Sequence, residues 1–229
     1  METCVSIARR LSEIQAVVNA AAARASRKPG DVRILAVSKI QPIALIEECY
    51  SLGLRDFGEN YVQELVEKRR LLAHLKDIRW HLIGHLQTNK AKQVVNEADC
   101  FHALDSEKLL RELARRAERV LPVFIEVNID DEPSKAGVPP AVVEALVQAV
   151  RAEPKLKLEG LMCIPEAKSD PEMMRPAFRR MSALARKVEQ THPLLLSMGM
   201  SSDFEVAVEE GANWVRVGAK LFGERPQRG

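Results

Sequence analysis

Short apolar runs alternate with longer stretches of helical periodicity along almost the whole chain. Runs such as ILAV and LPVFIEV are apolar at successive positions, which is typical of strands buried on both faces. The pattern predicts strands at Arg33–Ser38, Asp56–Glu59, Arg79–Gly84, Cys100–Leu104, Val120–Asn128, Lys157–Cys163, Leu194–Met198 and Trp214–Gly218.

The stretches between these runs carry apolar side chains at helical spacing. They predict helices near 42–52, 60–75, 88–96, 106–119, 139–152, 172–191 and 203–210. A first amphipathic helix is expected over residues 3–25, ended by the Lys28-Pro29-Gly30 turn. Ser106 is placed as an N-cap, and Ser202 with Glu205 has the pattern of a capping box.

Strands that alternate with helices pair in parallel, because parallel neighbours need a crossover connection. Eight such units close naturally into a barrel, so the expected fold is α/β, a single (β/α)8 TIM-type barrel with an extra N-terminal helix. We expect one domain over 1–229, with this helix and its turn over 1–29 and a frayed tail over 224–229. An open doubly wound sheet is the alternative that the pattern leaves open.

Charge and cysteine content narrow the classes of partner. The 34 basic and 32 acidic residues leave a net charge of +2, which gives no general attraction to nucleic acid or to an anionic membrane. No apolar stretch approaches the roughly 20 residues that span a bilayer, and the N-terminal segment does not have the pattern of a signal peptide. The four cysteines are scattered without a CxxC pair, so we expect no zinc or dithiol motif and a cytoplasmic location.

In barrels of this kind the active side chains lie at the carboxyl ends of the strands. Lys39 follows the first strand and shares the parity of Leu35 and Val37, so it faces the same side. Desolvation at an apolar mouth lowers the pKa of a lysine, and the neutral amine is the form that attacks an aldehyde to give a Schiff base. A solvated lysine just past a strand is the simpler alternative.

The other end of the chain offers a candidate anion site. A short helix after strand seven would present unpaired N–H groups, and Gly218 after strand eight would allow backbone to approach a phosphate. Arg216 lies in the apolar run WVRVG and therefore needs an acceptor, either a strand-end acid such as Glu126 or a ligand ring. Asn60 either caps a helix with Gln63 or lies at the mouth, and both roles are compatible.

His81 and His85 have the spacing of a metal-binding pair on a helix. The segment WHLIGHL has a strand pattern instead, in which residues four apart are about 13 Å distant. The two rings therefore cannot chelate one ion, and no metal site is expected. His85 could still line the mouth, whereas His102 has no partner pattern.

The segments ILAVSK, FGENYVQE, WHLIGHLQTNK, SKAG, SMGMSSDFEVAVEEGA and VRVGAKLFG resemble the YggS/PROSC family, the pyridoxal phosphate homeostasis proteins. The match runs from about residue 30 to 223 with the motifs in the right order, which makes it highly specific. The family fold is that of the N-terminal barrel of alanine racemase, in agreement with the predicted strands.

The resemblance implies which residues contact pyridoxal 5′-phosphate (PLP). Lys39 would hold the cofactor aldehyde as a Schiff base, and Arg216 would donate to the pyridine nitrogen. Asn60 would lie near the cofactor, and Met162 would pack against its ring or the neighbouring groups. His85 is a further candidate at the mouth.

The phosphate would be held by Ser201 and by the backbone amides of Ser202, Gly218 and Ala219. The family usually has threonine or serine where this chain has Ala219. A side-chain hydrogen bond to the phosphate is then missing, which would weaken binding by about 1 kcal/mol.

The resemblance also implies a carrier. An arginine cannot be deprotonated in proteins, so on the pyridine nitrogen it would leave the ring a poor electron sink. Alanine racemases take a second base, a tyrosine, from a separate β domain, which we expect to be absent because the chain stops six residues after Gly223. Neither Tyr50 nor Tyr61 has a motif reason to face Lys39.

We therefore expect a monomer that stores, buffers or delivers PLP to PLP-dependent apo-enzymes, with little or no turnover. The alternatives are a PLP-dependent amino-acid racemase with a minimal barrel, and a barrel enzyme that acts on a phosphorylated metabolite without PLP.

Overall fold

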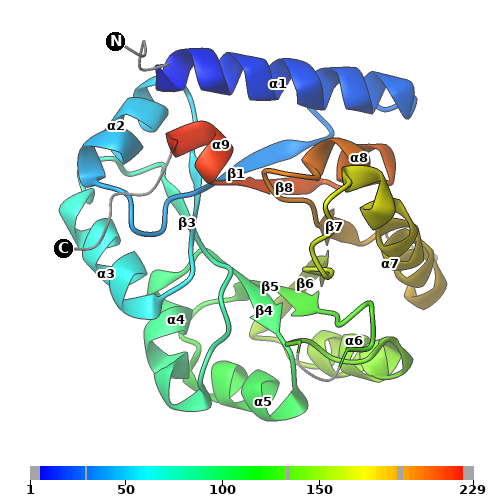
Figure 1. Cartoon of the computed structure of the whole chain (residues 1–229). Coiled ribbons are helices and arrows are strands. Elements are labelled where there is room, and N and C mark those ends of the chain that lie inside the picture. The colour runs from blue at the N-terminus through cyan, green and yellow to red at the C-terminus, as the bar shows by residue number, and fades with distance from the viewer. Residues whose placement is uncertain (1–5, 29, 133–134, 190–192, 224–229) are drawn as a thin grey trace.

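The eight predicted strands form one closed parallel barrel (Figure 1). The structure is a computed structural model that describes residues 6–28, 30–132, 135–189 and 193–223. The strands are β1 (Arg33–Val37), β2 (Asp56–Glu59), β3 (Arg79–Leu82), β4 (Cys100–Leu104), β5 (Leu121–Glu126), β6 (Leu156–Met162), β7 (Leu195–Ser197) and β8 (Trp214–Val217). Each strand pairs with the next and β8 pairs with β1, which excludes the open doubly wound sheet.

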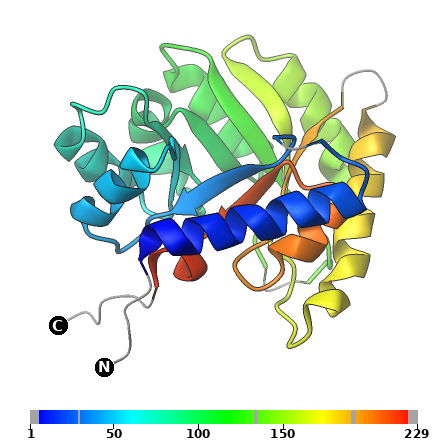
Figure 2. The same cartoon turned by 90° about the horizontal axis from the view of Figure 1, so that it is seen from above.

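Helices surround the barrel (Figures 1 and 2). They are α1 (Ile7–Arg24), α2 (Ile43–Ser51), α3 (Val62–Leu71), α4 (Ala91–Glu97), α5 (Glu107–Arg116), α6 (Val143–Arg151), α7 (Arg175–Val188), α8 (Phe204–Glu209) and α9 (Ala219–Phe222). Single turns of 3₁₀ helix precede three of them: η1 (Thr88–Lys90), η2 (Pro140–Val142) and η3 (Pro171–Met174). The pattern predicted all of these helices except α9.

Local capping sets several helix starts. Ser6 and Ser106 are the N-caps of α1 and α5, and each hydroxyl accepts a hydrogen bond from the N–H three residues later at 3.3 Å. The N-cap predicted at Ser106 is therefore confirmed. Residues 3–5 of the first predicted helix, Pro29 of the predicted turn and the predicted tail over 224–229 lie outside the described residues.

A bulge and a close contact shape the β5–β6–β7 wall. Val123 pairs with Leu158 but Phe124 pairs with Gly160, so Glu159 is the extra residue on β6. A Cβ atom at Gly160 would lie 1.9 Å from the carbonyl oxygen of Leu195. Only glycine therefore lets β7 pair with β6 at this point.

The seam between the first and last strands brings the two ends of the sequence together. Leu35 is in register with Arg216 and Ala36 with Val217. Outside this seam α1 lies along α8 and α9 (Figure 2). Residues that follow β1 and β8 consequently meet at the carboxyl end of the barrel. None of the helices among the described residues is long and apolar enough to cross a bilayer.

Candidate functional site

A cavity of about 300 Å³ opens at the carboxyl ends of the strands. It is lined by Val37, Lys39, Asn60, Ile83, Ile164, Met200, Ser201, Ser202, Arg216, Gly218 and Ala219. The structure thus brings together most of the residues that the sequence placed in one site. They come from the loops after β1, β2, β7 and β8 and from β8 itself.

Two predicted residues do not line this cavity. The side chain of His85 is 60% exposed, and its Nδ1 lies 3.1 Å from a carboxylate oxygen of Asp105. Met162 is fully buried at the last position of β6, in register with Ser197 and Glu126. Neither residue contacts the space that the other predicted residues enclose.

Both neighbours of Lys39 are anchored. The Ser38 side chain is fully buried, and its hydroxyl donates to Oε1 of Glu59 at 2.6 Å. The N–H of Ile40 donates to Oε1 of Glu64 at 2.5 Å. Ile40 has φ of +64°, a conformation that costs a β-branched residue about 1–3 kcal/mol. The backbone that carries Lys39 is therefore held in a turn that it would not adopt by itself.

A buried lysine joins these anchors. The ammonium group of Lys68 donates to the carbonyl oxygen of Ser38 at 2.6 Å, to Glu59 at 2.9 Å and to Glu64 at 2.7 Å. Burial raises the pKa of Glu59 to about 7 against the opposing charge of Lys68. Because Lys68 binds the Ser38 carbonyl and both glutamates that anchor the turn, it helps to fix the position of the Lys39 backbone.

The loops after β7 and β8 are tied to each other. The N–H of Gly218 donates to the hydroxyl of Ser201 at 3.3 Å. A Cβ atom at Gly218 would lie 3.3 Å from the carbonyl oxygen of Val37, a distance that leaves little room for a side chain. Gly218 thus lets the β8 loop lie against the end of β1, beside Lys39.

The capping box predicted at Ser202 and Glu205 is wrong. The N-cap of α8 is Asp203, whose carboxylate accepts from the N–H of Met200 at 2.7 Å and from the hydroxyl of Ser202 at 3.1 Å. Glu205 points outward and pairs with Arg24 of α1. The Asp203 carboxylate therefore bonds to the loop before α8 rather than to an N–H of the helix itself.

The guanidinium of Arg216 is buried, with 3% of the residue exposed. It donates to the carbonyl and hydroxyl oxygens of Ser197 at 2.7 and 3.0 Å and to the carbonyl of Cys163 at 2.9 Å. The alternative of an ion pair with Glu126 is wrong among the described residues, because the acceptors are two carbonyls and a hydroxyl. Burial lowers the pKa of Arg216, but an arginine keeps its charge in proteins.

Glu126 instead lies at the end of β5, and its buried Oε2 has no hydrogen-bond partner among the described residues. Burial, helped by the charge of Asp105, raises its pKa to about 7. A carboxyl group in this setting takes up a proton near neutral pH rather than neutralising the arginine.

Apolar residues of the cavity were missed. Ile83, Ile164 and Met200 line it, and each lies one to three residues beyond the end of a strand. Their positions at or near predicted strand ends could have identified these residues from the sequence. Side chains without chemistry of their own gave no reason to select them.

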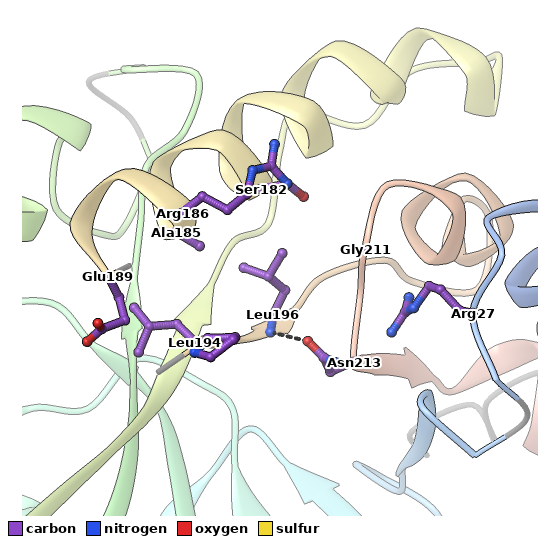
Figure 3. A pocket seen from close by; sticks show the side chains of 10 residues that line it. Arg27, Ser182, Ala185, Arg186, Glu189, Leu194, Leu196, Gly211 and Asn213 are labelled. Carbon is purple, nitrogen blue, oxygen red and sulfur yellow. Dashed lines mark hydrogen bonds between the residues drawn. The ribbon is translucent and has the colours of Figure 1, made fainter. Parts of the chain in front are cut away.

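A second hollow, of about 510 Å³, lies outside the barrel beside α7 and the start of β7 (Figure 3). Its polar groups are used within the fold: Asn213 accepts from the N–H of Leu196 at 2.9 Å, and Arg27 donates to the carbonyl oxygens of Val208 and Ala212. The mouth cavity therefore remains the candidate site, because it gathers the candidate chemistry at the strand ends.

Comparisons with known proteins agree with the barrel fold. Residues 10–226 match the family model described as alanine racemase, N-terminal domain. Pyridoxal phosphate homeostasis proteins from Aquifex aeolicus and Pseudomonas aeruginosa are 41% and 40% identical to the chain. The alignments cover 98% and 96% of this chain and 99% and 96% of those proteins.

A solved structure shares the fold at similar identity. PipY of Synechococcus elongatus with PLP bound superposes with a TM-score of 0.82 and is 36% identical, over 95% of this chain and 100% of that one. The closed parallel barrel, the family model and these near full-length relatives lead to one conclusion: the chain belongs to the pyridoxal phosphate homeostasis protein family, built on the alanine racemase N-terminal domain.

Proposed function

We propose that this protein binds PLP in the mouth cavity, attached as a Schiff base to Lys39, and serves as a carrier of the cofactor. The observation that carries the proposal is the meeting of Lys39 with Ser201 and Gly218 in one cavity, although they are far apart in sequence. The PLP-bound structure of PipY supports the same ligand.

The residues present fit the cofactor. PLP carries an aldehyde, a phosphate and a pyridine nitrogen, and it supplies a reactive carbonyl and an electron-withdrawing ring when bound. Lys39 would bind the aldehyde, and Ser201 with the N–H groups of Ser202, Gly218 and Ala219 would bind the phosphate. The fixed Arg216 would face the ring nitrogen, and Asn60 would contact the ring. A volume of about 300 Å³ suits a small ligand.

Apolar residues form part of the cavity wall. Val37, Ile83 and Ile164 line the space that also holds Lys39. A wall of this kind, with a few polar groups, is usual for a pocket that binds a small organic cofactor.

The reaction with borohydride tests the attachment. Protein loaded with PLP, reduced and digested should carry a phosphopyridoxyl group on the Lys39 peptide, and Lys39→Ala should lose both this adduct and the yellow absorbance. Lys108→Ala, which removes an exposed lysine on α5, should keep both. An adduct on other lysines with Lys39 unmodified would contradict the proposal.

The missing hydroxyl at Ala219 gives a second test. Ala219 is the first residue of α9 and lines the cavity, so Ala219→Ser should add one donor to the phosphate and lower the Kd for PLP about five-fold. Ala183→Ser adds the same hydroxyl on an exposed position of α7 and should leave the Kd unchanged. Equal Kd values for both variants would place the phosphate elsewhere.

We further propose that the protein has little or no turnover and delivers PLP to apo-enzymes of the cytoplasm. A guanidinium on the ring nitrogen keeps that nitrogen unprotonated, which disfavours carbanion chemistry. Racemisation needs a second base opposite the lysine. The hydroxyl of Tyr50 donates to Asp77, Tyr61 is exposed, and neither tyrosine lines the cavity. Cys49, Cys100 and Cys163 are free thiols, in keeping with a reducing compartment.

Exchange of the α-hydrogen of an amino acid tests the absence of turnover. Loaded protein incubated with L-alanine or D-alanine in deuterated water should incorporate deuterium no faster than free PLP does. The Lys39→Ala protein with added PLP is the matched control. Exchange that exceeds both backgrounds and requires Lys39 would favour the racemase alternative.

A further inference from the structure

A continuous line of polar side chains crosses the interior of the barrel below the mouth cavity. Arg216 donates to Ser197 at 3.0 Å, and the Ser197 hydroxyl lies 3.1 Å from Nδ1 of His102. His102 Nε2 lies 2.9 Å from His81 Nδ1, and His81 Nε2 lies 2.9 Å from Asp56. The line runs through β8, β7, β4, β3 and β2 in turn.

Every member of this line is buried in a place where barrels normally hold apolar side chains. His102 stacks on Phe124 at 4.3 Å between ring centroids, and His81 lies 5.1 Å from the Trp214 ring. The far end is Asp56, the first residue of β2, whose other carboxylate oxygen accepts from Arg79 at 2.5 Å. Asp56 and Arg79 line a hollow of about 160 Å³ at the opposite end of the barrel from the mouth.

The chemistry of the end groups sets the direction of each hydrogen bond. Asp56 is ionised, because His81 and Arg79 lower its pKa although burial opposes them, so it only accepts and His81 Nε2 carries a hydrogen. A neutral His81 then accepts at Nδ1, which requires His102 to donate from Nε2. Burial, together with the charge of Arg216, lowers the pKa of His102 well below its usual value, so His102 is neutral and accepts at Nδ1 from Ser197.

The line contains one carboxylate and has an arginine next to each of its ends. Arg216 and Arg79 put two positive charges next to this line, and Asp56 is the carboxylate that the line contains. Aligned donors along the two rings let this carboxylate stabilise the distant guanidinium of Arg216 through the dipoles between them.

We propose that Asp56, His81, His102 and Ser197 form a one-way hydrogen-bond chain that positions Arg216 and fixes it as a donor toward the mouth cavity. These four are positioning residues. The benefit for a bound cofactor rests on the proposed function, whereas the chain itself does not. The chain connects the hollow lined by Asp56 and Arg79 with the cavity at the opposite end of the barrel.

Nitrogen-15 NMR of the histidine side chains in the ligand-free full-length protein tests the chain. At neutral pH both His81 and His102 should be neutral with the hydrogen on Nε2, assigned by His81→Gln and His102→Gln. Asp56→Asn should change the ring shifts of His102, which Asp56 does not touch. Asp99→Asn is the matched control, because Asp99 lines the same hollow as Asp56 but accepts from Arg69 and from the N–H of Trp80.

Two results would overturn the chain: an imidazolium at His81, or His102 shifts that ignore Asp56→Asn. A third is stoichiometric Zn²⁺ held by the protein and lost in Cys100→Ser. His81, Cys100 and His102 offer ligand atoms within 4.8 Å of one another, and a metal there would replace the bond between the two rings.

A second readout uses the loaded protein. Ser197→Ala removes the link to His102 but keeps the 2.7 Å bond from Arg216 to the Ser197 carbonyl. It should shift the absorbance maximum of bound PLP, while Ser182→Ala, which removes a buried hydroxyl of α7, should not. An unchanged spectrum in Ser197→Ala would show that the chain does not act on Arg216. Failure of PLP to bind would refute the proposed function and leave the NMR result standing.

Discussion

The pairing of the first strand with the last is the constraint on which the site depends. The ladder from Arg33–Trp214 to Ala36–Val217 closes the barrel and sets the end of β1 beside the loop after β8. Without this seam, Lys39 and Gly218 would lie on strands at opposite edges of an open sheet. Because a closed parallel barrel fixes every strand against two neighbours, the distance between the lysine and the serine loop is set by the whole sheet rather than by local contacts.

Stability is reduced where the site is organised. The turn around Lys39 contains a strained isoleucine and a buried lysine bound to two glutamates, while Arg216 is buried without a carboxylate beside it. Buried ion pairs and unusual backbone angles commonly cost free energy of folding rather than add to it. Such features persist at places where geometry matters more than stability, and here they position two residues that line the cavity, Lys39 and Arg216.

The sequence predicted most of the fold, because it depends on patterns of short range. Strand and helix periodicities placed every strand of the barrel within a few residues. The carboxyl-end rule selected Lys39 and Gly218 for one site, and the family resemblance added Ser201. Features that depend on three-dimensional neighbours were not predictable. The N-cap of α8 is Asp203 rather than Ser202, and the Asp203 carboxylate accepts from the N–H of Met200 in the preceding loop.

Polar contacts between side chains of different strands were the feature that the sequence predicted least well. His81 and His102 come from neighbouring strands and meet only because β3 and β4 pair, so the linear sequence did not link the two rings. The acceptors of Arg216 were equally hidden, because two of them are backbone carbonyls. The type of a residue indicates which groups its side chain can bind. The register of the paired strands determines which groups lie within its reach.

A crystal structure of the protein soaked with PLP is the most direct test of the central claim. We expect continuous electron density between Nζ of Lys39 and the cofactor, with the phosphate within hydrogen-bond distance of Ser201 and the backbone of Gly218. Cofactor bound without a covalent link, or seated outside the barrel in the hollow beside α7 (Figure 3), would contradict it.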